Sequence, residues 1–336
     1  METTPLAPVS LVSRNPQISV DQLLKQLVPP REFSTSSFDN YIPDSRFDSQ
    51  AQAVRVAHTF ATGKKHGLDA ATTKQLKNSP GVYLDGGFGV GKTHLLAATW
   101  HAFKGKKVFG SFLAFTGLIG VLGFANAVKA LGAYDLICID EFELDDPGDT
   151  MMMSRLLSEL APKGVKFAAT SNTPPNALGQ GRFAAADFAR EISAMADRFT
   201  IITVDGEDYR HRPTESSATA LSDEQLLQWI ASFEPPLAAL DDFALLLKHL
   251  STLHPSRYLQ LLDSVNALAI KDAFLLHDQV AALRWVALVD RLYENKVALR
   301  ATGIPLTACF SEEMLGGAYR KKYLRAISRL GALSEL

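Results

Sequence analysis

Hydrophobic and polar positions follow two alternating patterns through the middle of the chain. Five short apolar runs predict buried strands, and segments with helical spacing lie between most of them. The predicted strands are Val82–Leu84, Lys106–Phe112, Leu136–Phe142, Lys166–Asn172 and Thr200–Val204. The predicted helices are His94–Trp100, residues 116–132 and a segment from about Asp145 to Ala161. This alternation predicts an α/β fold with a parallel sheet.

The segments before this region give weaker signals. Residues 1 to about 18 are rich in Pro, Ser and Thr, a composition that predicts disorder. Helical spacing predicts a helix over Val20–Val28, ended by Pro29 and Pro30, and another over about Ser49–Thr62. We expect a lysine-containing linker from there to Pro80.

A second patterned region follows a predicted linker, Pro213–Ala220. Its predicted helices are Leu221–Phe233, Leu237–Leu250 and Val280–Lys296, and its predicted strands are Val265–Ile270 and Val297–Ala301. Arg320–Leu330 is predicted to be a basic amphipathic helix. Such a helix suits an acidic partner, lipid or nucleic acid, and it equally suits a solvated helix face.

The stretch from Gly86 to Thr93 carries the clearest chemical signal. It fits G-x-x-x-x-G-K-[ST] and lies between a predicted strand and a predicted helix, the context of a phosphate-binding P-loop. Its glycines allow N–H groups to point at phosphate oxygens, and Lys92 can reach the β- and γ-phosphates of ATP. The predicted nucleotide-binding residues are Gly86, Gly87, Phe88, Gly89, Val90, Gly91, Lys92, Thr93 and His94.

Two carboxylates end the third predicted strand. A buried strand followed by acidic residues, some fifty residues after a P-loop, is the Walker B pattern. Asp140 is predicted to hold Mg²⁺ together with the Thr93 hydroxyl, and Glu141 is predicted to orient and polarise the attacking water. A solvated acidic turn is the alternative for this pair.

Polar residues after the fourth predicted strand are further site candidates. Asn172 lies at the carboxyl edge of the sheet, where ligands bind, and can contact the γ-phosphate or the water. The alternative is a turn-forming Asn before Pro174. Arg182, with Arg190 and Arg198 as competitors, is the predicted arginine finger for a neighbouring subunit's γ-phosphate. A single arginine there is more often a surface ion pair.

Aromatic residues give two open alternatives. The segment Phe33–Ile42 resembles the segment that covers adenine in ATPases of the AAA+ type, and it also fits a loop packed on the core by Phe38 and Tyr41. Phe112 and Phe115 could reach a partner or a pore, but their spacing favours the core.

Bulk composition narrows the class of protein. Of 336 residues, 47% are hydrophobic and 21% charged, as in ordinary globular proteins. The net charge of −2 gives no general basic excess for nucleic acid, without excluding a local patch. The two cysteines lack metal-like spacing, and no apolar run reaches the length of a membrane span. We expect a cytoplasmic protein without a signal peptide.

At these residues the chain resembles the AFG1-like ATPase family. GGFGVGKT, LICIDEFELDD and AATSNTPP match AAA+ ATPases in general. GRFAAADF, VDGEDYRHR, RWVALVDRLYENKVAL and RAISRL match this family, and GRFAAADF with YRHR is similar to its actinobacterial members. The resemblance implies an ATPase that acts with FtsZ at division sites or, as in mitochondrial relatives, in protein quality control. No lid arginine is identified by position, and Arg210, Arg212 and Arg329 are the candidates.

These observations predict an oligomeric P-loop ATPase that uses ATP and Mg²⁺ to remodel a protein partner. The expected parts are an N-terminal tail with the covering segment (1–65), the ATPase core (66–213) and a C-terminal α/β and helical part (214–336). A DNA-associated loader or regulator is the rival function, and a nucleotide switch with little turnover is a third.

Overall fold

The chain divides into two compact units. The computed structural model describes residues 8–17, 19–87, 89–144, 147–174, 178, 189–207, 219–234, 237–317 and 319–336. Val20–His211 form one unit, here called the P-loop unit. Met1–Ser19 and Arg212–Leu336 form the other, here called the terminal unit. The grouping differs from the expected three parts, because residues 20–65 belong with the P-loop and the first residues belong with the C-terminal part.

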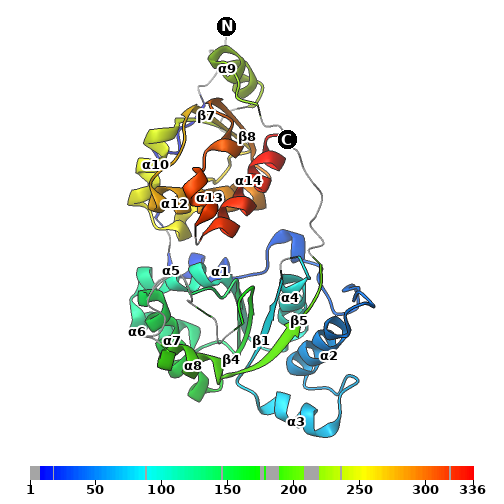
Figure 1. Ribbon diagram of the computed structural model, residues 1–336. Coiled ribbons are helices and arrows are strands. Elements are labelled where there is room, and N and C mark those ends of the chain that lie inside the picture. Colours follow the sequence, from blue (N-terminus) through cyan, green and yellow to red (C-terminus); the bar gives the residue numbers. More distant parts are fainter. Residues whose placement is uncertain are drawn as a thin grey trace. The chain divides into compact units, whose positions relative to one another are not determined.

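The P-loop unit is built on a five-stranded parallel sheet, which confirms the predicted α/β class (Figure 1). Its strands are β1 Gly81–Gly86, β2 Lys107–Ser111, β3 Leu136–Asp140, β4 Lys166–Ser171 and β5 Phe199–Val204, in the order β2-β3-β4-β1-β5. Its helices are α1 Val20–Lys25, α2 Asp48–Thr62, α3 Ala70–Asn78, α4 Lys92–Ala102, α5 Phe112–Leu122, α6 Phe124–Leu131, α7 Pro147–Leu160 and α8 Ala189–Ala196.

Strand order decides which helices cover which face. The connection from β1 to β2 runs across the sheet in one direction, and those from β2 through β4 to β5 run in the other. Since parallel crossovers are right-handed, α4 lies on one face and α5 to α8 lie on the other. Helix α2 packs beside α4, and apolar side chains of both helices share a core with Val82 and Leu84 of β1.

Three local expectations for this unit are corrected. Phe112 begins α5 instead of ending β2, because the Ser111 side chain caps the helix by accepting from the Ala114 N–H. The predicted helix 116–132 is two helices, separated at Gly123, whose φ of 74° is not helical. The expected linker before Pro80 contains α3, which Asp69 caps.

The terminal unit contains a three-stranded parallel sheet in the order β6-β7-β8. Its strands are β6 Ala238–Asp242, β7 Ala267–Ala273 and β8 Ala298–Gly303. Its helices are α9 Asp223–Ala231, α10 Phe243–Thr252, α11 Tyr258–Leu261, α12 Gln279–Glu294, α13 Glu312–Gly316 and α14 Arg320–Leu333. Helices α10, α12 and α14 contribute to the larger core, while α9 packs on alanines of the opposite sheet face.

The predicted helix Leu237–Leu250 is wrong in its first half. Ala238–Asp242 pair with β7 as strand β6, and the helix begins only at Phe243. The Asp242 side chain accepts from the Leu245 N–H and so caps α10. Pairing within the sheet has therefore overridden the local preference of alanine for helix.

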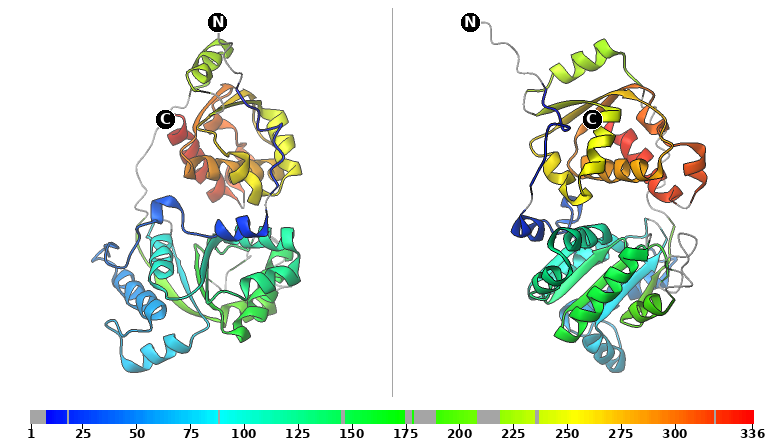
Figure 2. Two further views of the ribbon diagram at one scale, coloured as in Figure 1. Left: turned by 180° about the vertical axis from the view of Figure 1, so that it is seen from behind. Right: turned by 90° about the vertical axis from the view of Figure 1, so that its left-hand side faces the viewer.

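The expected disorder of the first residues is wrong for residues 8–17. Val9 forms a parallel bridge with Ala239, and Leu11 is fully buried in the core of the terminal unit. The main-chain oxygen of Arg14 lies 2.8 Å from Nε2 of His249 in α10. Figure 2 shows this dark blue segment running alongside α10. We call residues 8–17 the N-terminal strap.

The basic helix predicted at the C-terminus is α14, and its charge is partly neutralised. Arg325 and Arg329 both form ion pairs with Asp290 of α12. Tyr323, Ala326, Leu330 and Leu333 of α14 face the core of the terminal unit, and Leu324 is exposed. None of the helices in the described ranges has the length and apolarity that crossing a membrane requires.

Candidate nucleotide site

The glycines of the P-loop hold backbone angles that other residues resist. Gly86 has a φ of 150°, and a Cβ there would lie 2.2 Å from the Val204 carbonyl oxygen. Gly91 has a φ of 85° and precedes α4 without a side-chain cap, and a Cβ there would lie 2.5 Å from the Tyr41 ring. Only glycine fits both positions. Phe88, one of the predicted binding residues, lies outside the described residues.

Lys92 is a buried cation that carbonyl oxygens hold at the mouth of the loop. Its Nζ donates to the carbonyl oxygens of Gly86 at 3.0 Å and Gly87 at 2.5 Å. It also donates to Oδ1 of Asn172 at 3.0 Å, across eighty residues of sequence. The structure thus brings together two of the predicted site residues, and their roles toward phosphate stay predictions.

Asp140 and Thr93 face one another across the space between β3 and α4. Thr93 Oγ1 lies 3.1 and 3.2 Å from the two carboxylate oxygens of Asp140. The Thr170 hydroxyl also donates to Asp140. Burial, and then the neighbouring charge of Glu141, raise the pKa of Asp140 to about 6. A hydroxyl and a carboxylate beside a phosphate-binding loop are the oxygen ligands that suit Mg²⁺.

Glu141 has an unusual backbone conformation. Its φ is 52°, in the left-handed region that residues with a side chain seldom adopt. The Thr170 side chain accepts from the Glu141 N–H at 3.2 Å and helps to hold this conformation. Such outliers gather at functional sites, where the surrounding structure maintains them. The predicted role of Glu141 toward water stays a prediction.

The segment that precedes α2 lies across the P-loop and along α4. The Tyr41 hydroxyl donates to the Val90 carbonyl oxygen at 2.8 Å, and the Tyr41 ring meets the His94 ring at 61° with centroids 5.6 Å apart. Nε2 of His94 lies 3.0 Å from the Ser37 carbonyl oxygen. His94, predicted to bind nucleotide, therefore contacts this segment, while Ile42 beside it is 89% exposed.

Gln50 joins this segment to the end of β5. Its Oε1 accepts from the Asp44 N–H, and its Nε2 donates to the Asp205 carbonyl oxygen, both at 2.8 Å. Phe38 and Tyr41 also pack on the core, as one of the two sequence interpretations proposed. Phe112 and Phe115 are buried, which confirms the core interpretation for them.

The arginine candidates fall into two groups. Arg182, Arg210 and Arg212 lie outside the described residues. Arg190 is exposed, and a side-chain nitrogen of Arg198 donates to Ser158 Oγ at 3.0 Å. Arg329 pairs with Asp290 within the terminal unit.

Sequence reasoning missed Thr170 and Glu143. Thr170 bonds Asp140 and the N–H of Glu141, and Glu143 bonds the turn that carries Asn172. The signal for Thr170 was its place in the polar end of β4. The signal for Glu143 was a third carboxylate, two residues after Glu141, and the structure shows that it is buried.

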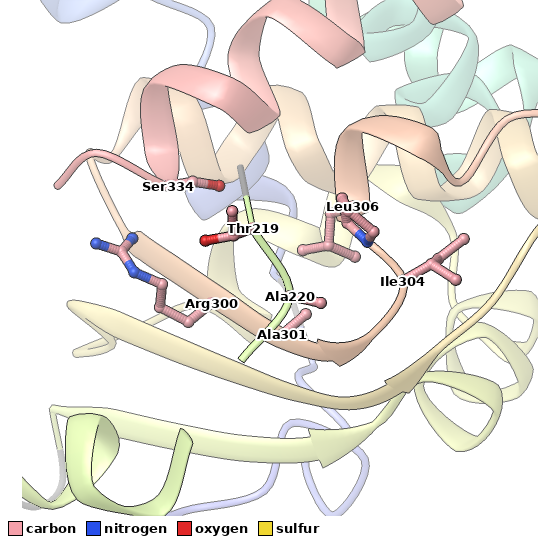
Figure 3. Close-up of a pocket in the computed structure, with 8 residues that line it drawn as sticks. Thr219, Ala220, Arg300, Ala301, Ile304, Leu306 and Ser334 are labelled. Atoms are coloured by element: carbon pink, nitrogen blue, oxygen red, sulfur yellow. The ribbon is translucent and has the colours of Figure 1, made fainter. Parts of the chain in front are cut away.

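A small hollow in the terminal unit lies apart in the sequence from these residues. Its volume is about 10 Å³, close to that of a single water molecule. Figure 3 shows how β8 and the segment before α9 enclose it. The lining residues are Thr219, Ala220, Arg300, Ala301, Ile304, Pro305, Leu306 and Ser334. It is too small for a nucleotide.

Comparisons with known proteins match the sequence over most of its length. A family model described as AFG1-like ATPase matches residues 17–235 and 233–335. The cell division protein ZapE of Escherichia coli (strain K12) is 27% identical over 301 residues, covering 76% of this chain and 78% of that protein. Lactation elevated protein 1 homolog B of Danio rerio is 37% identical over 78 residues, 23% of this chain and 16% of that protein.

Solved structures give lower similarity. The structure of DnaI is 20% identical with a TM-score of 0.42, covering 56% of this chain and 99% of that one. The replication initiator DnaA bound to AMPPCP and single-stranded DNA is 16% identical with a TM-score of 0.39. That match covers 52% of this chain and spans about half of the DnaA chain (51%).

Proposed function

The chain belongs to the AFG1-like ATPase family and is a P-loop ATPase, and we propose that it uses Mg²⁺-dependent ATP hydrolysis to remodel a protein partner in cell division. The observation that supports hydrolysis best is the meeting of three elements at one sheet edge. Lys92 from α4 touches Asn172 after β4, and Thr93 of α4 touches Asp140 of β3.

Binding of the phosphates falls to the loop and the start of α4. The uncapped N–H groups after Gly91 and the Lys92 ammonium supply donors and positive charge toward anionic oxygens. Thr93 and Asp140 would hold Mg²⁺, which when bound neutralises charge on the phosphates. These residues suit the ion because their ligand oxygens, from α4 and β3, already face one another.

The Glu141 carboxylate is the group proposed to activate the attacking water. Its carboxylate is attached to a backbone that Thr170 holds in the left-handed region, directly after the proposed Mg²⁺ ligand Asp140. A carboxylate there can orient a water and polarise it for attack. Asn172, whose Oδ1 accepts from Lys92, lies on the same edge and can contact the γ-phosphate.

Recognition of the base is assigned to the Tyr41 segment. Tyr41 lies on Gly91, and Ile42 next to it exposes its apolar side chain. An exposed apolar residue beside the phosphate loop suits the flat face of adenine. Ile42→Ser should therefore weaken ATP binding without changing kcat, and an unchanged Kd for ATP would remove this segment from the base site.

The proposed partner is the division protein FtsZ, because the E. coli relative of 27% identity is a cell division protein. Turnover by the purified full-length chain is measured alone, with polymerised FtsZ and with single- or double-stranded DNA. We expect stimulation by FtsZ polymer and none by DNA. Stimulation by DNA alone would favour the rival DNA-associated loader. Capture of FtsZ by Glu141→Gln in ATP, and not in ADP, is the matching binding test.

The protein is proposed to work as a homo-oligomer with Arg182 as the finger supplied to the next subunit. Arg182→Ala should bind ATP normally and hydrolyse it poorly, since a finger contributes about a thousandfold or more to turnover. Mixing Arg182→Ala with Glu141→Gln should restore part of the activity, because some interfaces then join an intact finger to an intact Glu141. Co-assembly without recovery would reject Arg182 and leave Arg190 as the next residue to test.

A further inference from the structure

Glu143 is buried and binds one turn through three hydrogen bonds. Its Oε1 accepts from Ser171 Oγ at 3.0 Å and from the Asn172 N–H at 3.1 Å. Its Oε2 accepts from Thr173 Oγ1 at 3.2 Å. Glu143 is only 9% exposed, and burying a polar group is costly unless such donors bind it. All three donors come from the end of β4 and the turn after it, which carries Asn172.

The backbone around Glu143 is fixed as well. Phe142, one residue earlier, is buried, and its N–H donates to the Thr170 carbonyl oxygen at 2.7 Å. The Phe142 ring lies edge-on to the rings of Tyr83 and Phe112. Each of the three residues after β3, from Glu141 to Glu143, is therefore hydrogen-bonded to β4.

We propose that Glu143 is a positioning residue for ATP hydrolysis that acts through Asn172. Its carboxylate holds the Asn172 main chain, so that the amide oxygen stays within 3.0 Å of the Lys92 ammonium. It also links the segment after β3, which carries Glu141, to the turn after β4, which carries Asn172. The water-activating group and the phosphate-contacting group are thereby held at a constant separation. This inference rests on the hydrolysis proposed above.

A positioning role and a general structural role predict different kinetics. A structural role lowers stability and affects binding and turnover together. A positioning role lowers kcat while leaving ATP affinity nearly unchanged, because Lys92, Thr93 and the loop glycines stay in place. Small displacements of a reacting group can cost about a hundredfold in rate.

The test is a double-mutant cycle between Glu143 and Asn172 in the full-length chain. Glu143→Ala, Asn172→Ala and the double variant are compared for kcat, for Kd of a fluorescent ATP analogue and for Tm. We expect each single variant to lose about ten- to a hundredfold in kcat, and the double variant to lose no more than Asn172→Ala. Equal kcat in the last two shows that Glu143 acts through Asn172.

Thr173→Val is the matched control. It removes one hydrogen bond to Glu143 but leaves the bonds from Ser171 and the Asn172 N–H, so kcat should stay within about threefold of wild type. Glu143→Gln keeps one oxygen for those two donors and should recover most of the turnover that Glu143→Ala loses. If Glu143→Ala does not fold, the cycle is run with Glu143→Gln, whose smaller loss must likewise vanish in the Asn172→Ala background.

Two results would overturn the proposal. One is multiplication of the two kcat losses in the double variant, and the other is a Kd for the ATP analogue that rises as much as kcat falls. Failure of the underlying function looks different, because wild type would then turn over ATP no faster than Lys92→Ala.

Discussion

Asp140 and Asp241 hold similar places in two different sheets, and they have different partners. Each lies at the carboxyl end of a parallel strand, Asp140 in β3 and Asp241 in β6. Asp140 accepts from the hydroxyls of Thr93 and Thr170. Asp241 accepts from Ser10 Oγ at 2.5 Å and from the N–H groups of Leu11 at 2.8 Å and Val12 at 3.3 Å.

The difference lies in what covers the strand end. In the P-loop unit the strand end faces Thr93 at the start of α4, a helix without a side-chain cap. In the terminal unit the N-terminal strap supplies its own N–H groups to Asp241 and buries Leu11 in the core. A carboxylate at a strand end is thus a candidate site in one unit and a structural anchor in the other.

The largest expected effect comes from removing the Lys92 ammonium, the cation beside the sheet end of the P-loop unit. Lys92→Ala should abolish nucleotide binding, because the β- and γ-phosphates lose their main positive partner. Binding of labelled ATP by equilibrium dialysis measures this, with Lys64→Ala, an exposed lysine of the same unit, as the control. Wild-type affinity in Lys92→Ala would reject the P-loop assignment.

The next effect concerns chemistry at the same sheet end. Glu141→Gln should bind ATP and hydrolyse it about a hundred- to ten-thousandfold more slowly, since an amide cannot polarise water as a carboxylate does. Single-turnover hydrolysis with bound ATP measures the step directly. A rate within a factor of a few of wild type would remove Glu141 from catalysis.

A third prediction concerns the sheet end of the terminal unit, which the N-terminal strap covers. Leu11→Ala should lower the free energy of unfolding of the terminal unit by about 2–5 kcal/mol, because it empties a fully buried site. Hydrogen exchange should show faster opening of β6, β7 and β8 than in wild type, with β1 to β5 unchanged. Leu227→Ala, at a residue of the same unit that is 45% exposed, is the matched control. Equal effects of the two substitutions would show that the strap does not stabilise this unit.

The smallest expected effect follows from the pKa of Asp140. Burial raises that pKa from the ordinary value of 3.8 to about 6, so between these two pH values the folded protein holds a proton there that the unfolded chain has released. The stability that this carboxyl contributes to the folded metal-free protein therefore falls as the pH rises from 3.8 to about 6 and is lost above that. Below that pH a proton competes with Mg²⁺ for the same oxygens.

The Mg²⁺ concentration for half-maximal turnover should therefore rise as the pH is lowered from about 7.5 to about 5.5. Thr170→Val removes a hydrogen bond that lowers the Asp140 pKa, so the rise should begin at a higher pH in this variant. The same pH profile in both proteins would show that Thr170 does not tune Asp140.

Local sequence determined the parts of the site whose chemistry is contiguous. The P-loop needs glycines, a lysine and a hydroxyl close together in the sequence, so Gly86 to Thr93 could be recognised without the fold. The same holds for Asp140 and Glu141 after an apolar strand, and for the parallel α/β class, because alternating strand and helix periods are properties of neighbouring residues.

Only the tertiary structure decided which distant groups meet. The sheet order places β4 between β3 and β1, which brings Thr170 to Asp140, Asn172 to Lys92 and Glu143 to the Asn172 turn. The expectation of disorder is wrong for the strap because it rests on a composition rich in Pro, Ser and Thr. The order of the strap comes from pairing with β6, some 230 residues away. Strand pairing and burial are long-range, and short-range patterns contain no information on which segments they will join.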